Sequence, residues 1–234
     1  MNGEYKESEI ALEIAETVYD ELTRHGVNAV LSRTSQGTDA ETDLPVKIAH
    51  CNSFDPDLAV DIHINAGGGK GFEAIVYHGG GKSLAMGQNI EAEVLKIGQN
   101  SRGMKTRLNS QGNDYFGWIR QVDAPSVILE AAFIDNPADL LLIKTAEGRR
   151  NFGIAYAKGL LKTLGIEYVD ADADEKKEDI MIYKTINDIP DWGKKTVGKL
   201  IEKKALSGTG SGELNMSYDM LRIMVVLDRL GKLD

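Results

Sequence analysis

The sequence predicts an α/β protein, with a twisted, mostly parallel sheet flanked by helices and followed by a small helical module. Three observations lead to this prediction. Short apolar runs alternate with amphipathic segments of ten or more residues, which is the pattern of β-α-β units. The 234 residues are 42% hydrophobic and 27% charged, as expected for a globular chain that buries a core. Beyond residue 166 the sequence becomes acidic and polar, which separates the sheet-forming part from the C-terminal part.

The first predicted element is a helix that ends before Gly26. Apolar residues recur at Ile10, Ile14, Val18 and Leu22, and this spacing gives one buried stripe along a helix. Gly26 is a typical stop, because glycine readily adopts the left-handed conformation that ends many helices.

The following elements are predicted from apolar runs that are bounded by glycine, proline or polar residues. In chain order, we expect a strand over 27–31, a helix over 44–52, strands over 58–64 and 71–77, a helix over 83–97, and strands over 116–122 and 126–132. A polar, glycine-rich loop is expected over 98–114. Pro137 suits the first turn of a further helix, and another helix ends near Gly165.

Two side chains near the ends of predicted strands are candidates for catalysis. His63 lies near the end of the strand 58–64, just before the glycines 67–69, and Glu130 lies near the end of the strand 126–132. Because ligands bind at the carboxyl ends of parallel strands, we expect both side chains at the same rim of the sheet. A carboxylate in so apolar a run is costly to bury unless it is paired or lies near a metal.

A histidine beside a carboxylate indicates a zinc hydrolase. Hydrolytic zinc sites take three ligands from His, Glu and Asp, and a nearby carboxylate serves as the general base. From the residues alone, His63 fits a hydrogen-bonded histidine at a strand end equally well, and Glu130 could turn its side chain to solvent. Glu7 fits an acid favoured by the dipole at a helix N-terminus better than a ligand, with Glu4 and Glu9 as rivals for any role.

Basic residues in the loops are candidates for lining a substrate groove, although charged loop residues usually face water. They are Arg33, Arg102, Lys105 and Arg107.

The overall composition argues against several classes of protein. The formal net charge is −9, which argues against a nucleic-acid partner because phosphate binding needs a basic surface. No apolar run approaches the roughly 18 residues of a membrane span. Cys51 is the only cysteine, so no internal disulfide can form.

The acidic segment 167–180 is predicted to be a linker, because its Asp, Glu and Lys residues offer almost nothing to bury. Residues 181–234 then form a predicted helical module. One helix begins at Pro190, and Ser217 is a suitable N-cap for the next helix. With about 50 residues the core of this module is small, so partner contacts would help to stabilise it.

Four segments, in this order, resemble the zinc-dependent N-acetylmuramoyl-L-alanine amidases of the type-3 family, which are bacterial autolysins and phage endolysins. The segments are Lys6–Ala15, Val30–Arg33, Asp61–Ala66 together with Gly71–Glu73, and Pro125–Asn136. The resemblance covers about residues 3–165, and the ordered set is far more specific than any one motif. It agrees with a twisted sheet flanked by helices.

The resemblance implies a Zn²⁺ cofactor held by Glu7 and His63, with Glu130 as the catalytic carboxylate and Asn65 as a substrate-binding residue. It favours Glu7 over its neighbours, because the family's ligand stands five residues before the leucine matched by Leu12. The implied substrate is peptidoglycan, cleaved at the amide between N-acetylmuramic acid and L-alanine. The implied location is extracellular, in the cell wall, or, for a phage protein, release at lysis.

The sequence departs from the family at its beginning. The family opens with a strand that ends in Asp-Pro-Gly-His-Gly-Gly or a similar sequence, and its histidine is a zinc ligand. We therefore expect residues 1–166 to be an amidase domain that is truncated at its N-terminus and lacks the first strand and the third ligand, a histidine. One alternative is a catalytically inactive remnant that only binds the cell wall, and a weaker one is a zinc carboxypeptidase-like hydrolase.

The C-terminal module 181–234 is loosely similar to a small domain behind some clostridial and phage amidases and to S-layer homology repeats. The similar residues are Ile189–Trp192, Val197–Ile201 and Met220–Ile223, through Arg229. This similarity implies attachment to the cell envelope. The alternative is a unit for self-association or a purely structural unit.

Overall fold

The computed structural model describes residues 5–33, 43–170, 182–206 and 213–233. The chain divides into two compact units, Met1–Tyr168 and Val169–Asp234, and each is described by itself. Most of the expected linker, residues 171–180, lies outside the described residues.

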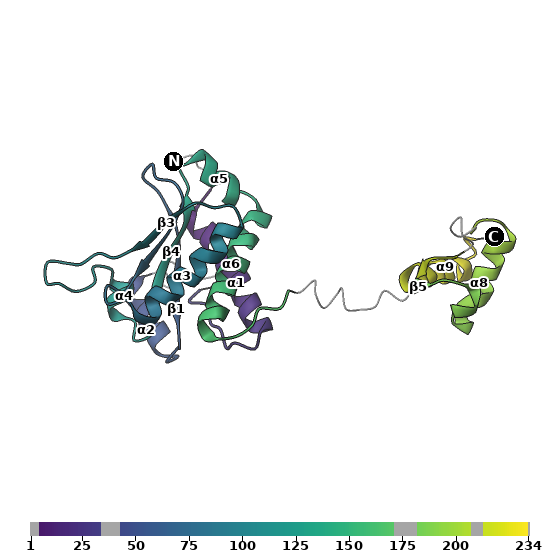
Figure 1. The fold of residues 1–234 in the computed structure, drawn as a ribbon, viewed down its shortest axis with the longest axis horizontal. Helices are drawn as coiled ribbons and strands as arrows, with labels where there is room; N and C mark the ends of the chain where they lie inside the picture. The colour runs from purple at the N-terminus through teal and green to yellow at the C-terminus, as the bar shows by residue number, and fades with distance from the viewer. Residues whose placement is uncertain (1–4, 34–42, 171–181, 207–212, 234) are drawn as a thin grey trace. The chain divides into compact units, whose positions relative to one another are not determined.

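A four-stranded mixed sheet forms the centre of the first unit (Figure 1). Its spatial order is β1-β4-β2-β3, in which β1 pairs with β4 and β2 with β3 in parallel, while β2 and β4 are antiparallel. The predicted α/β class is therefore confirmed. The strands are β1 (Ala59–Asn65), β2 (Phe72–Val76), β3 (Ser101–Lys105) and β4 (Ser126–Phe133).

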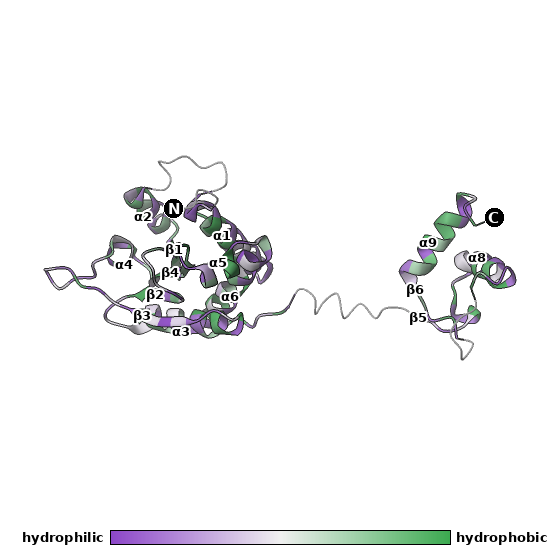
Figure 2. Ribbon diagram, turned by 90° about the horizontal axis from the view of Figure 1, so that it is seen from above, coloured by the Kyte–Doolittle hydropathy of each residue, from purple (hydrophilic) through white to green (hydrophobic). Residues whose placement is uncertain are grey.

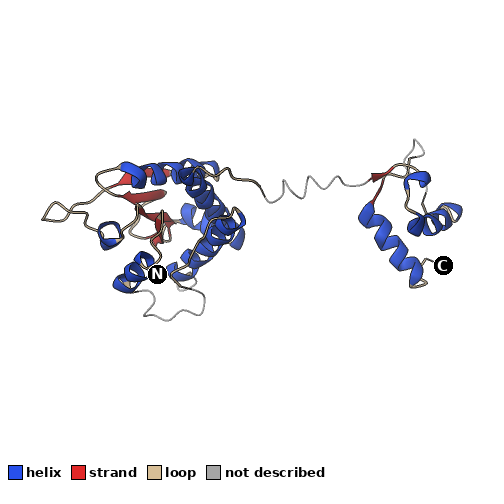
Figure 3. Cartoon of the chain, turned by 90° about the horizontal axis from the view of Figure 1, so that it is seen from below, coloured by secondary structure: helices blue, strands red, loops and turns tan. Residues whose placement is uncertain are grey.

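Long helices cover one face of this sheet, and two short helices cover part of the other (Figure 3). Apolar residues of α1, α3 and α6 pack with alternate residues of β4, such as Val127 and Leu129, in the larger core. Ile48 of α2 and Trp118 of α4 pack with Ile128 on the opposite face, in a smaller core. The helices are α1 (Glu7–Arg24), α2 (Leu44–Asn52), α3 (Gly81–Lys96), α4 (Gly117–Gln121), α5 (Pro137–Ile143) and α6 (Ala146–Leu164).

The predicted stripe of α1 is confirmed, since Ile10, Ile14 and Val18 are buried. The hydropathy colouring of Figure 2 shows apolar and polar residues alternating around the long helices, as amphipathic helices require. Gly26 follows the helix with a φ of 77°, in the left-handed region expected at such a stop.

The strand expected over 27–31 is absent from the described sheet. These residues pair with no described strand, and the side chain of Val30 is 47% exposed. An apolar run of this length favours extended backbone, but a strand also needs the backbone of a neighbour, and the run itself does not specify one.

The strand expected over 116–122 is also wrong, because α4 occupies this segment. Trp118, Ile119 and Val122 are all buried, and their spacing places them on one side of a helical turn. Within the expected loop 98–114, the structure contains β3, an edge strand whose residues are polar or only half-buried. Edge strands often lack the apolar pattern by which strands are recognised.

The second unit has a small core of its own. Tyr183, Ile189, Val197, Leu221 and Val225 are buried in it, together with Met216. The elements are β5 (Ile182–Tyr183), a 3-10 helix η2 (Ile186–Asp188), α8 (Asp191–Glu202), β6 (Met216–Ser217) and α9 (Tyr218–Arg229), with β5 and β6 antiparallel.

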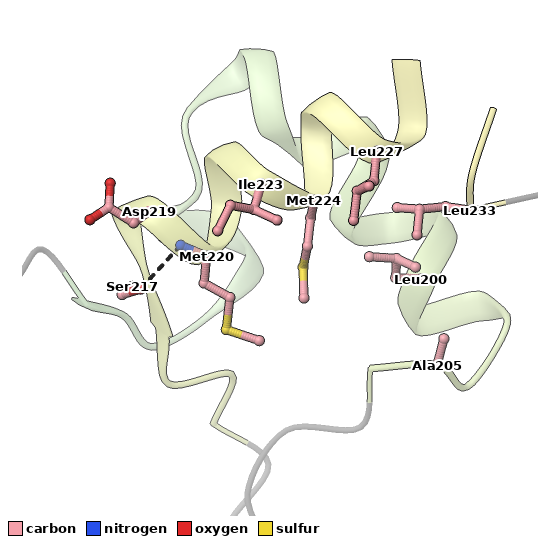
Figure 4. Close-up of a pocket in the computed structure, with 9 residues that line it drawn as sticks. All are labelled: Leu200, Ala205, Ser217, Asp219, Met220, Ile223, Met224, Leu227 and Leu233. Carbon is pink, nitrogen blue, oxygen red and sulfur yellow. Dashed lines mark hydrogen bonds between the residues drawn. The ribbon is translucent and has the colours of Figure 1, made fainter. Parts of the chain in front are cut away.

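The predicted N-cap of α9 is confirmed, since the Ser217 hydroxyl accepts a hydrogen bond from the Met220 N–H at 3.2 Å. Beside this cap lies an apolar hollow of about 570 Å³, lined by Met220, Ile223 and Met224 of α9 and by Leu200 of α8 (Figure 4). None of the described helices in either unit is both long and apolar enough to cross a bilayer.

Candidate functional site

The two candidate catalytic side chains lie side by side on the sheet. His63 of β1 and Glu130 of β4 are register partners in the parallel pairing of these strands. Side chains alternate between the faces of a strand, so both belong to the face that carries Ile128 and the short helices. The side chain of His63 is 38% exposed on this face.

Glu7 reaches this site from the first turn of α1. Its Oε1 lies 2.8 Å from the Nδ1 of His63 and accepts a hydrogen bond from the Ile64 N–H at 3.3 Å. The hydrogen bond with His63 lowers the pKa of Glu7. Of its rivals, Glu9 pairs with Lys6 at an exposed position, and Glu4 lies outside the described residues.

Asp61 contacts the other nitrogen of the imidazole, an interaction that the sequence did not reveal. Its Oδ2 lies 3.2 Å from the Nε2 of His63, while its Oδ1 accepts a hydrogen bond from Lys47 at 3.0 Å. The hydrogen bonds with Asp61 and Glu7 raise the pKa of His63 to about 10. The one feature of the sequence that indicates this contact is the spacing of Asp61 and His63, because residues two apart on a strand share a face.

Glu130 lies between His63 of β1 and Glu73 of β2, both of which are its register partners. Burial raises the pKa of Glu130 to about 7. Its Oε2 is buried and has no hydrogen-bond partner among the described residues. A buried carboxylate oxygen without a hydrogen-bond partner costs free energy. A bound ligand or water molecule that donates a hydrogen bond to this oxygen would remove that cost.

The donors present fit a zinc site in part. Glu7 and His63 Nδ1 face each other, and a carboxylate and an imidazole are two of the donor types from which a hydrolytic zinc takes its three protein ligands. Asp61 on the far nitrogen is the usual partner of a metal-binding imidazole. Among the residues that the structure describes, no group of three or more His, Cys, Asp or Glu is arranged to hold a metal.

Two further aspartates shape the loops around the site. Asp135 Oδ2 accepts hydrogen bonds from the Gly67 and Gly68 N–H groups at 2.8 Å each, and both glycines have positive φ. The buried Asp139 accepts from the N–H groups of Gly71 and Phe133. Neither role is predictable from the sequence, because the main-chain partners of an aspartate cannot be inferred from its type.

A hollow of about 400 Å³ opens beside Glu130, and Asn65 is in its wall. The Asn65 Nδ2 donates to Glu73 Oε2 at 3.2 Å, and Glu73 also pairs with Arg102. The other lining residues are Ile75, Lys105, Thr106, Arg107 and Phe116. Of the four loop cations considered from the sequence, Lys105 and Arg107 thus line the hollow.

Arg33 has a different environment. Its guanidinium donates to the backbone carbonyl of Ser8 in the first turn of α1. It is not among the residues that line the hollow beside Glu130.

An α/β sheet that presents a histidine and a half-buried carboxylate side by side on adjacent parallel strands has the donor and the proton acceptor that a hydrolytic site needs. The sequence model of one family, described as N-acetylmuramoyl-L-alanine amidase, matches residues 1–162. The chain belongs to this amidase family.

Relatives with similar sequences support this assignment. The N-acetylmuramoyl-L-alanine amidase CwlM of Bacillus licheniformis is 31% identical over 142 residues, which are 60% of this chain and 52% of that protein. The endolysin of Bacillus phage SPP1 is 31% identical over 183 residues, which are 74% of this chain and 64% of the endolysin. The chain thus matches between about half and two thirds of the length of these relatives.

Solved structures have the same fold. Cwp6 from Clostridium difficile aligns with a TM-score of 0.65 and 30% identity over 68% of this chain and 26% of that one. The amidase AmiC2 of Nostoc punctiforme aligns with a TM-score of 0.60 and 23% identity over 68% of this chain and 84% of AmiC2, a level of identity that shows the fold alone.

Proposed function

We propose that the protein hydrolyses peptidoglycan at the amide between N-acetylmuramic acid and L-alanine. The observation that carries the proposal is the register pairing of His63 with Glu130, with Glu7 on the imidazole, in a chain of the amidase family. The names of the relatives support the same bond as the target.

Glu7 and His63 are the proposed zinc ligands, together with a third donor that the described residues do not supply. A bound zinc would lower the pKa of a water molecule and stabilise negative charge on the carbonyl oxygen of the substrate. Asp61, held by Lys47, orients the imidazole so that Nδ1 points toward Glu7.

Glu130 is the proposed general base and acid. Its ionised carboxylate takes a proton from the attacking water as the new carbon–oxygen bond forms. It then gives that proton to the leaving nitrogen as the carbon–nitrogen bond breaks, which frees the amino group of L-alanine. A pKa near 7 suits both steps, because the group is then neither a very weak base nor a very weak acid at neutral pH.

Asn65 is the proposed contact for a polar group of the substrate, since its side chain lines the hollow next to Glu130. The amidase domain is proposed to occupy 1–166 and the helical module 181–234, joined by a linker over 167–180. The module is proposed to attach the protein to the cell wall, where the substrate is, either as a secreted protein or as a phage protein released at lysis.

The test is the release of new amino groups from purified cell walls by the 234-residue chain, with added zinc and with a chelator. The expected result is release of alanine N-termini that depends on zinc and is lost in Glu130→Gln. Release that persists with chelator, or release of other ends, would contradict the proposed activity.

A second candidate is an inactive protein that only binds cell walls, and the lack of a group of three metal donors among the described residues favours it. Metal analysis distinguishes the two functions. Sedimentation with insoluble peptidoglycan together with no bound zinc would favour the binding protein, whereas one zinc per chain would exclude it.

A further inference from the structure

Two cations beside Glu130 have no acidic partner among the described residues. Lys105 ends β3, Arg107 follows two residues later, and both line the hollow that also contains Glu130. Neither makes an ion pair within the described part of the chain. The positive charges of Lys105 and Arg107 are therefore available for an anionic ligand, although the chain as a whole has a net charge of −9.

Other cations near the site are already engaged. Lys47 pairs with Asp61 at 3.0 Å, and Arg102 pairs with Glu73. Arg120 donates to the backbone carbonyl of Asp114 at 2.6 Å. The two unpaired cations therefore do not reflect a general excess of positive charge in this region.

The loop that carries Arg107 is braced at its base. The Tyr115 N–H donates to the Arg107 carbonyl at 2.7 Å, and the Arg107 guanidinium lies 3.7 Å from the centre of the Tyr115 ring. Asp114 is buried, and its Oδ2 lies 2.8 Å from His78 Nδ1. The loop projects from the sheet between β3 and α4 (Figure 1), and stacking on Tyr115 holds the guanidinium at its base.

The wall of the hollow carries charges of both signs. Its carboxylates are Glu130, where the amide is proposed to react, and Glu73, which is paired with Arg102, while Lys105 and Arg107 supply positive charge. A guanidinium and an ammonium bind a carboxylate through charge-assisted hydrogen bonds. The volume of about 400 Å³ falls in the usual range for a small-ligand site.

We propose that this hollow binds the peptide on the amine side of the scissile amide, and that Lys105 and Arg107 bind a free carboxylate of that peptide. The inference rests on the proposed function, because that function places the scissile amide at Glu130. It adds that the protein selects anionic peptides over neutral peptides of the same size.

The test compares two probes, N-acetylmuramoyl-L-alanyl-D-glutamate and the same compound with both glutamate carboxylates converted to carboxamides. Binding is measured by titration calorimetry with the full chain carrying Glu130→Gln, so that neither probe is consumed. We expect Lys105→Gln and Arg107→Gln each to weaken binding of the acid about tenfold and to leave binding of the diamide unchanged. Lys82→Gln, at an exposed position in α3, is the matched control and should change neither affinity.

In the chain with Glu130 intact, the same two substitutions should raise KM for the acid and leave kcat within about twofold, because the carboxylate lies away from the reacting bond. Equal affinity of the two probes, loss of both affinities in Arg107→Gln, or no binding of the acid would overturn the inference. Charge-selective binding without any zinc-dependent hydrolysis would instead overturn the proposed function and leave the subsite standing.

Discussion

His63 of β1 and Glu130 of β4 occupy partner positions in the register of two parallel strands. The backbone hydrogen bonds of the sheet therefore fix the separation of the imidazole and the carboxylate, rather than the loops around them. A site held by paired strands keeps its geometry better than one held by loops, which is useful when a proton must be transferred. The antiparallel pairing of β2 with β4 places Glu73 on the other side of Glu130, which provides a second carboxylate for comparison.

Replacing Glu130 with Gln should abolish hydrolysis while leaving the metal site intact. The amide has nearly the same shape but cannot accept the proton of the attacking water, so we expect kcat to fall by about 10²-fold or more. Glu73→Gln, at the other register position, should cost much less, because Glu73 is paired with Arg102 and the proton transfer is proposed for Glu130. Amine release from cell walls measures both effects. Similar losses of activity in the two variants would argue against Glu130 as the general base.

The rate should depend on pH through the ionisation of Glu130. Burial raises the pKa of Glu130 to about 7, and only the ionised form can act as the base. The rate should therefore fall as the pH drops below about 7, approaching tenfold per pH unit. The positive charge of a bound metal shifts this fall toward lower pH and does not change its direction. The measurement is kcat from pH 5 to pH 8 at saturating zinc, and a flat profile would argue against Glu130 as the base.

The elements that the sequence predicts well are those with one strong pattern. The fourfold spacing from Ile10 to Leu22 predicts α1, and the apolar run before Glu130 predicts β4. The segment around Trp118 was ambiguous, because a short apolar run fits a strand or a helix turn equally well. The edge strand β3 lacks the alternation of apolar and polar residues by which a strand is predicted.

From the residues alone, without the family resemblance, the candidate site was predictable only where chemistry requires an unusual residue. Glu130 stands out because a carboxylate in an apolar strand is costly, and His63 stands out at the end of its strand. The contact of Asp61 with His63 is not predictable although the two residues are two apart on β1, because the type of an acidic residue does not specify its partner. Asp135 and Asp139 act on main-chain N–H groups remote in sequence, and only the folded chain reveals such contacts.

Zinc affinity should rise with pH, because the metal must displace a proton from His63. In the metal-free chain the hydrogen bonds with Asp61 and Glu7 raise the pKa of His63 to about 10, so the imidazole is protonated at neutral pH. We expect the Kd for zinc to fall roughly tenfold per pH unit between pH 6 and pH 8. In Asp61→Asn the dependence should flatten toward the upper end of this range, since His63 then titrates at a lower pH.

Competition with a chromophoric chelator measures this dependence. Asp114→Asn is the control, because Asp114 makes a similar contact with His78 away from the site. A slope that is the same in all three proteins would show that Asp61 does not set the protonation of His63.

The packing of α6 on α3 should depend on Gly159. A Cβ atom at this position would lie 2.5 Å from Ile90 Cα and 2.6 Å from Ile90 N, so the two backbones approach too closely for any side chain. Gly159→Ala should therefore destabilise the first unit by about 1–3 kcal/mol, although alanine is the better helix former. Gly198→Ala in α8 meets no atom within 4 Å and should instead stabilise its helix by up to about 1 kcal/mol.

Hydrogen exchange measures the stability of each unit separately. The amides of α3 and α6 should exchange faster in Gly159→Ala, and those of α8 should exchange more slowly in Gly198→Ala. Unchanged exchange in α3 and α6 would mean that the two helices can move apart at little cost.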